Sequence, residues 1–222
     1  MKKALLIFLS MASAGIVTTA RAQTAKPAAP ASAAIETKVA MCIGCHGIKG
    51  YQASFPEIHK VPMISGQGAK YIVAALVAYK KGERKHPTMR SIAGSMSEQD
   101  MADVAAYYEQ HGKQAAVPPE QAAAAPADVA ALLTKGACAS CHGANYSKPI
   151  DGASPKLAGQ HADYLYVALK AYQTEGNAKV GRSNAIMAGQ VKQFKLAELK
   201  AMAANIGSLP GDLQTVRQSP FR

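Results

Sequence analysis

The stretch Cys42-Ile43-Gly44-Cys45-His46 occurs a second time in this chain, as Cys138-Ala139-Ser140-Cys141-His142. Cys-x-x-Cys-His is the covalent attachment signature of a c-type haem. Two thiols three residues apart lie on one face of a helix, so each can add across one vinyl group of the porphyrin. The histidine that follows is then held close to the iron as its proximal ligand. Because the two copies use all four cysteines of the chain, we predict two covalently bound haem c groups.

Paired cysteines have three other common uses in proteins. A redox Cys-x-x-Cys motif of the thioredoxin kind is expected near a βαβ pattern, and neither copy lies in one. Zinc sites built from two such pairs usually separate them by roughly 15–20 residues, far less than the separation of Cys45 from Cys138. Disulfides Cys42–Cys45 and Cys138–Cys141 would leave both adjacent histidines unexplained.

Residues 1–22 have the pattern of a secretory signal peptide. Lys2 and Lys3 precede a short apolar run at residues 4–9, and small residues then lead to Ala20-Arg21-Ala22. This pattern predicts export with cleavage after Ala22. An uncleaved anchor is the alternative, although the apolar run is short for a membrane span, which needs about 20 residues. We expect a periplasmic protein, because c-type haem is attached outside the bacterial cytoplasm.

The chain is basic, with a formal net charge of +11. Its densest basic cluster outside the signal peptide comprises Lys80, Lys81, Arg84 and Lys85. No nucleic-acid-binding motif accompanies this cluster, so no nucleic-acid partner is expected. The cluster is either an ordinary solvated surface or a basic face that steers an acidic redox partner. Weak association with a membrane surface is compatible with the same charge.

The sequence contains an internal repeat. Residues 62–71 match residues 155–164, with Pro, Gly-Gln and Tyr at the same positions. Residues 114–126, between the copies, are rich in Ala and Pro, which is typical of an extended linker. The repeat predicts one haem-binding unit around each motif. The expected segments are a flexible leader at 23–33, domains at 34–113 and 127–210, and a C-terminal tail at 211–222 of no recognisable type.

Apolar spacing predicts an all-α fold. Residues 71, 75, 76 and 79 fall on one helical stripe, and so do residues 101, 104, 105 and 108. The second copy repeats the first stripe, and no alternating strand pattern longer than a few residues occurs. Units of under about 100 residues are small for independent cores, so we expect a buried haem to supply apolar surface in each.

The repeat also selects a second axial ligand for each iron. Aligning the last helices of the two units places Met89 on Met187, and no other methionine is paired with a methionine. Both lie in a turn-like stretch ahead of the last helix. We predict the axial pairs His46/Met89 and His142/Met187, with packing of these methionines in the core as the alternative.

Further paired residues have predicted roles around the ligands. The second nitrogen of a ligating imidazole usually makes a hydrogen bond that fixes the ring. The carbonyls of Pro62 and Pro155 could accept it, although proline in a turn is the ordinary interpretation. Tyr71 and Tyr164, on matching helices, either contact haem propionates or simply pack.

Taken together, these motifs resemble the cytochrome c4 family. The resemblance rests on the signal peptide, the two Cys-x-x-Cys-His units, the Pro-x-x-x-Gly-Gln segments with a following Tyr, and the stretch Ser97–Tyr108 after Met89. It covers residues 34–209 and implies two class I cytochrome c domains with facing haems. In that family the role is to carry electrons from a quinol–cytochrome c reductase to a haem–copper terminal oxidase. The second copy departs from the pattern at Phe194-Lys195-Leu196, which weakens the start of its last helix.

With His/Met ligation, neither iron has a free position for oxygen or peroxide. We therefore expect an electron carrier without a small-molecule substrate, not an enzyme. A dihaem subunit bound to a dehydrogenase is one alternative. The other is a dihaem enzyme, either a peroxidase or a sulfur-compound dehydrogenase. An enzyme whose iron is ligated by a cysteine is excluded, because all four cysteines are used in haem attachment. An enzyme whose methionine ligand is labile is compatible with the sequence.

Overall fold

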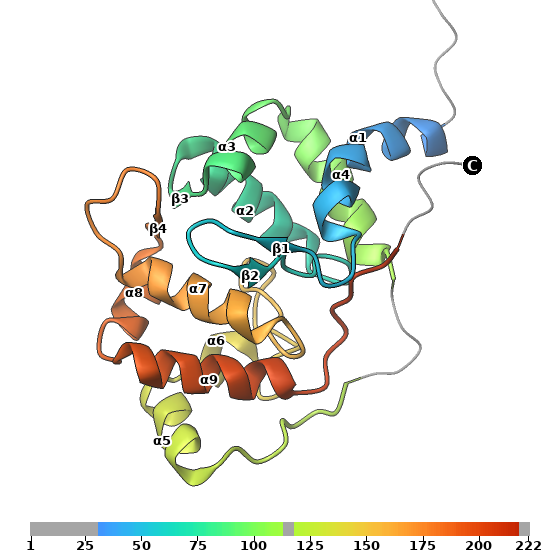
Figure 1. Ribbon diagram of the computed structural model, residues 1–222. Helices are drawn as coiled ribbons and strands as arrows, with labels where there is room; N and C mark the ends of the chain where they lie inside the picture. Colours follow the sequence, from blue (N-terminus) through green and yellow to red (C-terminus); the bar gives the residue numbers. More distant parts are fainter. Residues whose placement is uncertain (1–30, 113–117, 218–222) are drawn as a thin grey trace, which may run out of the picture.

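A computed structural model describes residues 31–112 and 118–217 of the chain (Figure 1). The predicted signal peptide and most of the leader lie outside the described residues. The helices are α1 (Ala31–His46), α2 (Ala69–Lys81), α3 (Pro87–Gly94), α4 (Glu98–Gln110), α5 (Ala127–Lys135), α6 (Ala139–His142), α7 (Ala162–Gln173), α8 (Ala185–Val191) and α9 (Leu196–Ser208). The strands are the two-residue segments β1 (Gln52–Ala53), β2 (His59–Lys60), β3 (Arg84–Lys85) and β4 (Gly181–Arg182). The predicted all-α fold is confirmed.

Each half of the chain has its own hydrophobic core. In the first domain, Val39 of α1, Leu76 of α2 and Val104 of α4 are buried together. In the second, Leu133 of α5, Leu165 of α7 and Leu199 of α9 do the same. The apolar stripes predicted from the sequence therefore form the contact between α2 and α4 in the first domain and between α7 and α9 in the second.

The last helices of the two domains begin differently. Ser97 and Asp100 form a capping box at α4: the Asp100 amide donates to Ser97 Oγ at 3.1 Å, and the Ser97 amide donates to Asp100 Oδ2 at 3.2 Å. At α9 the serine is replaced by Lys195, whose amide still donates to Glu198 Oε2 at 2.7 Å. The N-terminus of α9, which the sequence predicted to be weaker, thus keeps the capping-box hydrogen bond that its glutamate accepts.

The two domains pack through contacts that repeat about a pseudo-two-fold axis. β3 and β4 pair antiparallel, with Arg84 opposite Arg182. Gln67 Nε2 donates to the Lys156 carbonyl at 3.0 Å, and the Lys156 amide donates to Gln67 Oε1 at 3.0 Å. Gln160 binds the backbone of Met63 in the same way, at 2.9 and 3.0 Å. In the repeat Gln67 matches Gln160 and Met63 matches Lys156, so this reciprocal glutamine clasp has the form of a symmetric dimer interface.

One part of the interface has no counterpart in the second domain. The β1–β2 hairpin of the first domain lies against α7 (Figure 1). His59 stacks on Tyr164 with ring centroids 6.2 Å apart, and Lys170 forms an ion pair with Glu57 at 2.6 Å. This hairpin adds contacts on one side only, so the pseudo-symmetry of the interface is incomplete.

Residues 118–126, the described part of the predicted linker, contain no helix or strand. They lie along the second domain, where Asn145 Nδ2 donates to the Pro119 carbonyl at 2.8 Å and the Ala122 amide donates to the Ala144 carbonyl at 3.3 Å. No helix within the described ranges is long and apolar enough to cross a membrane.

Candidate haem sites

One cavity runs between the two domains and is lined by side chains from both. The predicted ligands His46, Met89, His142 and Met187 all line it, together with Cys42 and Cys45. Its wall is otherwise mainly aliphatic and aromatic, with residues from α2, α4, α7 and α9. The structure therefore brings the four predicted axial ligands, which are widely separated in the sequence, to one enclosed apolar space.

Both histidines are oriented by a backbone carbonyl. His46 Nδ1 donates to the Pro62 carbonyl at 2.7 Å, and His142 Nδ1 donates to the Pro155 carbonyl at 2.9 Å. A proton on Nδ1 leaves the lone pair on Nε2, which is the form in which a histidine binds a metal. Burial lowers the pKa of both imidazoles, against a smaller opposing effect of the hydrogen bond. Both rings are therefore neutral at pH 7.

The cysteines lie beside these histidines but on different local backbones. Cys42 and Cys45 belong to the last turns of α1, whereas Cys138 precedes α6 and follows a break at Ala137, which has φ of 46°. Burial raises the pKa of the Cys42 thiol to about 11, and burial also raises the pKa of Cys138. Thiols held in the protonated form are poor nucleophiles, which argues against a redox Cys-x-x-Cys motif.

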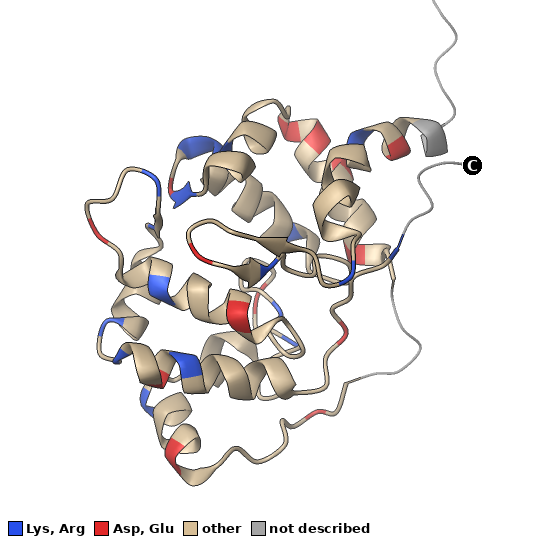
Figure 2. Cartoon of the chain, in the orientation of Figure 1, with Lys and Arg blue, Asp and Glu red and all other residues tan. Residues whose placement is uncertain are grey.

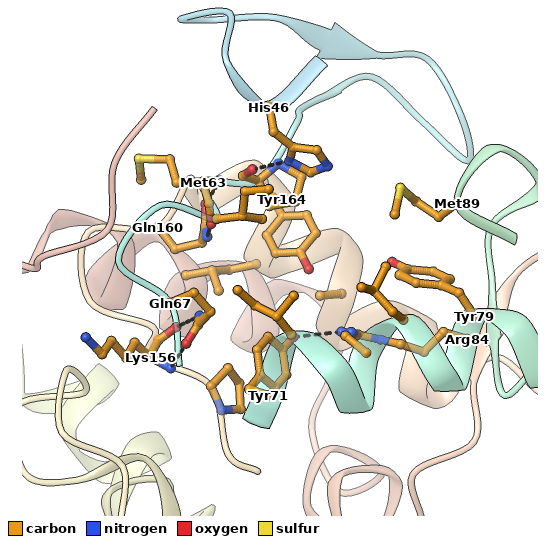
Figure 3. A pocket seen from close by; sticks show the side chains of 18 of the residues that line it. His46, Met63, Gln67, Tyr71, Tyr79, Arg84, Met89, Lys156, Gln160 and Tyr164 are labelled. Atoms are coloured by element: carbon orange, nitrogen blue, oxygen red, sulfur yellow. Dashed lines mark hydrogen bonds between the residues drawn. The ribbon is translucent and has the colours of Figure 1, made fainter. Parts of the chain in front are cut away.

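The predicted methionine ligands are in helices and not in the turns expected from the sequence. Met89 lies in the first turns of α3, and Met187 lies in α8. A side chain three residues earlier caps each helix: the Met89 amide donates to His86 Nδ1 at 3.4 Å, and the Met187 amide donates to Asn184 Oδ1 at 2.9 Å. Figure 3 shows the Met89 thioether and the His46 imidazole projecting from separate segments into the same space.

Two arginines meet at the centre of the interface: Arg84 is buried and Arg182 is half-buried. The sequence places Arg84 in an exposed basic cluster, either a solvated surface or a face that steers a partner, but only 8% of it is exposed. Its Nη2 donates to the Tyr71 hydroxyl at 2.9 Å, and Arg182 Nη2 donates to the Tyr164 hydroxyl at 3.2 Å. The guanidinium of Arg84 also lies over the Tyr79 ring, and that of Arg182 over the Tyr172 ring. The internal repeat could have identified these arginines, because they occupy matching positions in the two copies, as the tyrosines do.

The lysines of the predicted basic cluster stay at the surface: Lys80 and Lys81 are exposed and Lys85 is half-buried. Lys80 Nζ donates to the Met96 carbonyl at 2.6 Å, and Lys85 Nζ donates to the Asn177 carbonyl at 2.5 Å. Lys and Arg residues are distributed over both domains and are interspersed with Asp and Glu (Figure 2). Of the cluster at residues 80–85, only Arg84 is therefore withdrawn from the surface.

The two interface arginines, Arg84 buried and Arg182 half-buried, provide a test of whether a haem fits this cavity. Within residues 31–112 and 118–217, neither guanidinium pairs with a carboxylate. A buried cation is costly unless an anion compensates it. A haem carries two propionates, so two haems in the cavity would supply anions to Arg84 and Arg182. The donor set, the apolar wall and the unpaired cations all fit two haem groups.

Comparisons with known proteins agree with this chemistry. The cytochrome c family model matches the chain twice, at residues 32–111 and 126–210. Cytochrome c4 from Azotobacter vinelandii is 30% identical over 201 residues, which cover 82% of this chain and 90% of that protein. The chain belongs to the cytochrome c4 family.

Two further relatives bear on structure and partners. The crystal structure of reduced recombinant cytochrome c4 from Pseudomonas stutzeri superposes with a TM-score of 0.58 at 28% identity, covering 82% of this chain and all of that one. A thiosulfate dehydrogenase electron acceptor from Thiomonas intermedia is 33% identical, over 66% of this chain and 69% of its own length.

Membership of the cytochrome c4 family establishes several of the expectations drawn from the sequence. The protein consists of two cytochrome c domains, carries two covalently bound haem c groups and is a dihaem electron-transfer protein, not an enzyme. The features that the sequence interpretation missed are the arginine pair at the domain interface, the glutamine clasp and the residues that cap the methionine helices.

Proposed function

We propose that this cytochrome c4 carries single electrons in the periplasm from a respiratory reductase to a terminal oxidase. The observation that carries the proposal is the placement of one histidine and one methionine from each domain around a shared apolar cavity. A haem with His/Met ligation supplies one-electron chemistry at raised potential, because the thioether favours Fe(II). Two protein ligands on each iron leave no position for a substrate.

The side chains have distinct proposed roles. Cys42 and Cys45, and Cys138 and Cys141, would hold the two porphyrins through thioether bonds. His46 and His142 would be proximal ligands whose rings are fixed by the carbonyls of Pro62 and Pro155. Met89 and Met187 would be the distal ligands.

The tyrosine–arginine pairs have a proposed role at the other end of the haems. Arg84 with Tyr71, and Arg182 with Tyr164, would bind the propionates. These four residues meet at the domain interface, where Arg84 and Arg182 lie on paired strands. The haems would then approach each other through their propionate edges, which suits exchange of an electron within the molecule.

The domain boundaries and the export route are also proposed. The boundaries at residues 34–113 and 127–210 are supported by the two separate cores. Periplasmic location is supported by the family and by the signal-peptide pattern in residues 1–22. Mass spectrometry of the exported protein tests the export route and the haem count: the expected mature chain begins at Gln23 and carries two haems, and a mass with no haem or one haem would contradict the assignment.

The test of a carrier against an enzyme is carbon monoxide binding. If both irons are six-coordinate, the reduced protein will not bind carbon monoxide quickly at neutral pH, and turnover of hydrogen peroxide will be negligible. The protein will instead be reduced by a quinol–cytochrome c reductase and oxidised by a haem–copper oxidase. Fast carbon monoxide binding together with peroxide turnover would replace the carrier proposal with an enzymatic one.

A second candidate concerns the electron donor. The relative from Thiomonas intermedia is described as a thiosulfate dehydrogenase electron acceptor. This similarity supports the proposal that a sulfur-compound dehydrogenase, and not a quinol-linked reductase, reduces the present chain. Stopped-flow reduction with each purified donor distinguishes them: the physiological donor will reduce both haems rapidly and at low concentration, while the other will be slow.

A further inference from the structure

The C-terminal tail, for which the sequence offered no interpretation, crosses from the second domain to the first. It leaves α9 after Leu209 and rises along the first domain (Figure 1). Leu213, near its middle, is only 6% exposed. The tail is therefore packed into the molecule and is not an exposed extension, at least as far as residue 216.

The tail is hydrogen bonded to the backbone of the first domain. The Gln214 amide donates to the Ser65 carbonyl at 3.0 Å, within an antiparallel bridge between these two residues. The Gln214 side-chain amide donates to the Gly112 carbonyl. One residue of the tail thus joins two segments of the first domain, the loop before α2 and the end of α4.

The first domain is shaped to receive the tail at two glycines. A Cβ on Gly66 would lie 2.6 Å from the Asp212 carbonyl oxygen, and a Cβ on Gly112 would lie 2.4 Å from the Val216 side chain. Both glycines have positive φ, 84° and 72°, which other residues adopt only with strain. A side chain at either glycine would therefore prevent the tail from approaching the first domain this closely.

The tail also binds the second domain at the glutamine clasp. Asp212 Oδ2 accepts from Lys156 Nζ at 2.5 Å, and both atoms belong to half-buried side chains. Lys156 is the residue whose backbone is held by Gln67, two residues after Ser65. Asp212 and Gln214 therefore brace both partners of one half of the clasp, which joins the two domains.

We propose that residues 211–216 form an interdomain strap that holds the two haem domains in one orientation and so sets the rate of electron exchange between the haems. Asp212 and Gln214 are positioning residues in this proposal. The glutamine clasp and the β3–β4 pair are short polar contacts, whereas the strap adds a half-buried segment, anchored by the buried Leu213, that is covalently continuous with the second domain. The effect on electron exchange rests on the proposed function, whereas the effect on domain docking does not.

The experiment compares two truncations of the haem-loaded protein. Ending the chain after Pro210 removes the strap, and ending it after Arg217 removes only the residues beyond it. Amide hydrogen exchange at Met63 and Lys156 reports opening of the clasp, because each amide donates to a glutamine side chain. Flash photolysis reports electron exchange between the haems.

Without the strap, we expect the Lys156 amide to exchange at least tenfold faster and electron transfer between the haems to slow at least tenfold. The visible bands of both His/Met haems will be unchanged. The truncation after Arg217 will behave as the full chain. If the shorter chain does not accumulate, the variant Asp212→Asn/Gln214→Ala will show the same direction of change, with exposed Arg217→Ala as its matched control.

One outcome would overturn the strap itself, and a second would overturn its effect on electron exchange. Unchanged protection at Lys156 in both strapless proteins would show that the tail does not hold the domains. Faster amide exchange with unchanged electron exchange would show that docking is braced but the haem geometry is not set by it. Either result leaves the carrier function intact, whereas a loss of the His/Met bands in the full-length protein would count against the carrier function alone.

Discussion

At the residue scale, the side chains around the cavity include the proposed axial ligands, which the repeat predicts, and two arginines, which only the structure places at the domain interface. Met63 and Met96 also line the cavity. Met63 is engaged through its backbone by Gln160, and Met96 is 5% exposed in the core of the first domain. These two methionines are therefore suitable controls for the proposed ligands.

Replacement of the proposed methionine ligands will affect one haem at a time. Met89→Ala will abolish the thioether–iron charge-transfer band of the first haem, lower its reduction potential and open its iron to carbon monoxide, because the thioether stabilises Fe(II). Met187→Ala will do the same at the second haem. Redox titration with visible spectra measures the effect. A comparable change in Met96→Leu, with Met89→Ala unaffected, would show that the repeat alignment is in the wrong register.

Removal of a buried guanidinium will lower a reduction potential. In Arg84→Leu the cavity loses a positive charge that disfavours Fe(III), so the potential of the nearer haem will fall. Arg84→Lys keeps the charge but not the planar donor set, so its potential will stay closer to that of the natural protein. Spectroelectrochemical titration of both variants distinguishes an electrostatic role from simple packing, for which the two replacements would give similar potentials.

At the element scale, the first and last helices of the first domain are joined by ionic contacts. Lys38 of α1 binds Asp100 of α4, with Nζ and Oδ1 2.8 Å apart, and also contacts Asp103. These charges are on the surface, where single ion pairs contribute little to stability at neutral pH. Their effect is visible instead in the dependence of stability on pH.

Acid will remove this contact in a defined range. The hydrogen bond from Lys38, followed by those from Ser97, lowers the pKa of Asp100 from 3.8 to about 2. A carboxylate with a lowered pKa in the folded state adds stability above its unfolded pKa, and this is lost as pH falls through the folded pKa. Stability will therefore decline between about pH 4 and pH 2. Lys38→Met will show a shallower decline in calorimetric unfolding over this range, while Lys200→Met, at an exposed position of α9, will not.

At the scale of the whole molecule, two kinds of contact hold the two cytochrome domains together. Some repeat about the pseudo-two-fold axis, and others are made by an element that only one domain has. The glutamine clasp and the β3–β4 pair are symmetric, whereas the β1–β2 hairpin and the C-terminal strap each belong to one domain only. The asymmetric contacts distinguish the present chain from a dimer of two identical haem domains.

Loss of the glutamine clasp will separate the unfolding of the domains. The double variant Gln67→Leu/Gln160→Leu removes four hydrogen bonds across the interface. At roughly 0.5–1.5 kcal/mol for each bond, docking will weaken by about 2–6 kcal/mol. Calorimetry will then resolve two transitions where the natural protein shows one. Gln190→Leu, on the exposed side of α8, is the control, and a single unchanged transition in the double variant would contradict the role of the clasp.

The sequence by itself determined the cofactors, the helical class and the candidate ligands. Cys-x-x-Cys-His has few meanings, and helical periodicity is a local property of neighbouring residues. The duplication then served as an internal comparison, since only Met89 and Met187 match as methionines. It predicted side chains that the structure places around one cavity.

Only the tertiary structure decided which polar residues are buried and how the domains are joined. In the sequence, Arg84 lies between charged residues and has the pattern of a solvated segment, yet it is buried because the second domain covers it. The clasp joins residues 89 and 97 positions apart, and Gln214 reaches back 102 positions to Gly112. No local pattern encodes such contacts, because each depends on the shape that a distant part of the chain adopts when it folds.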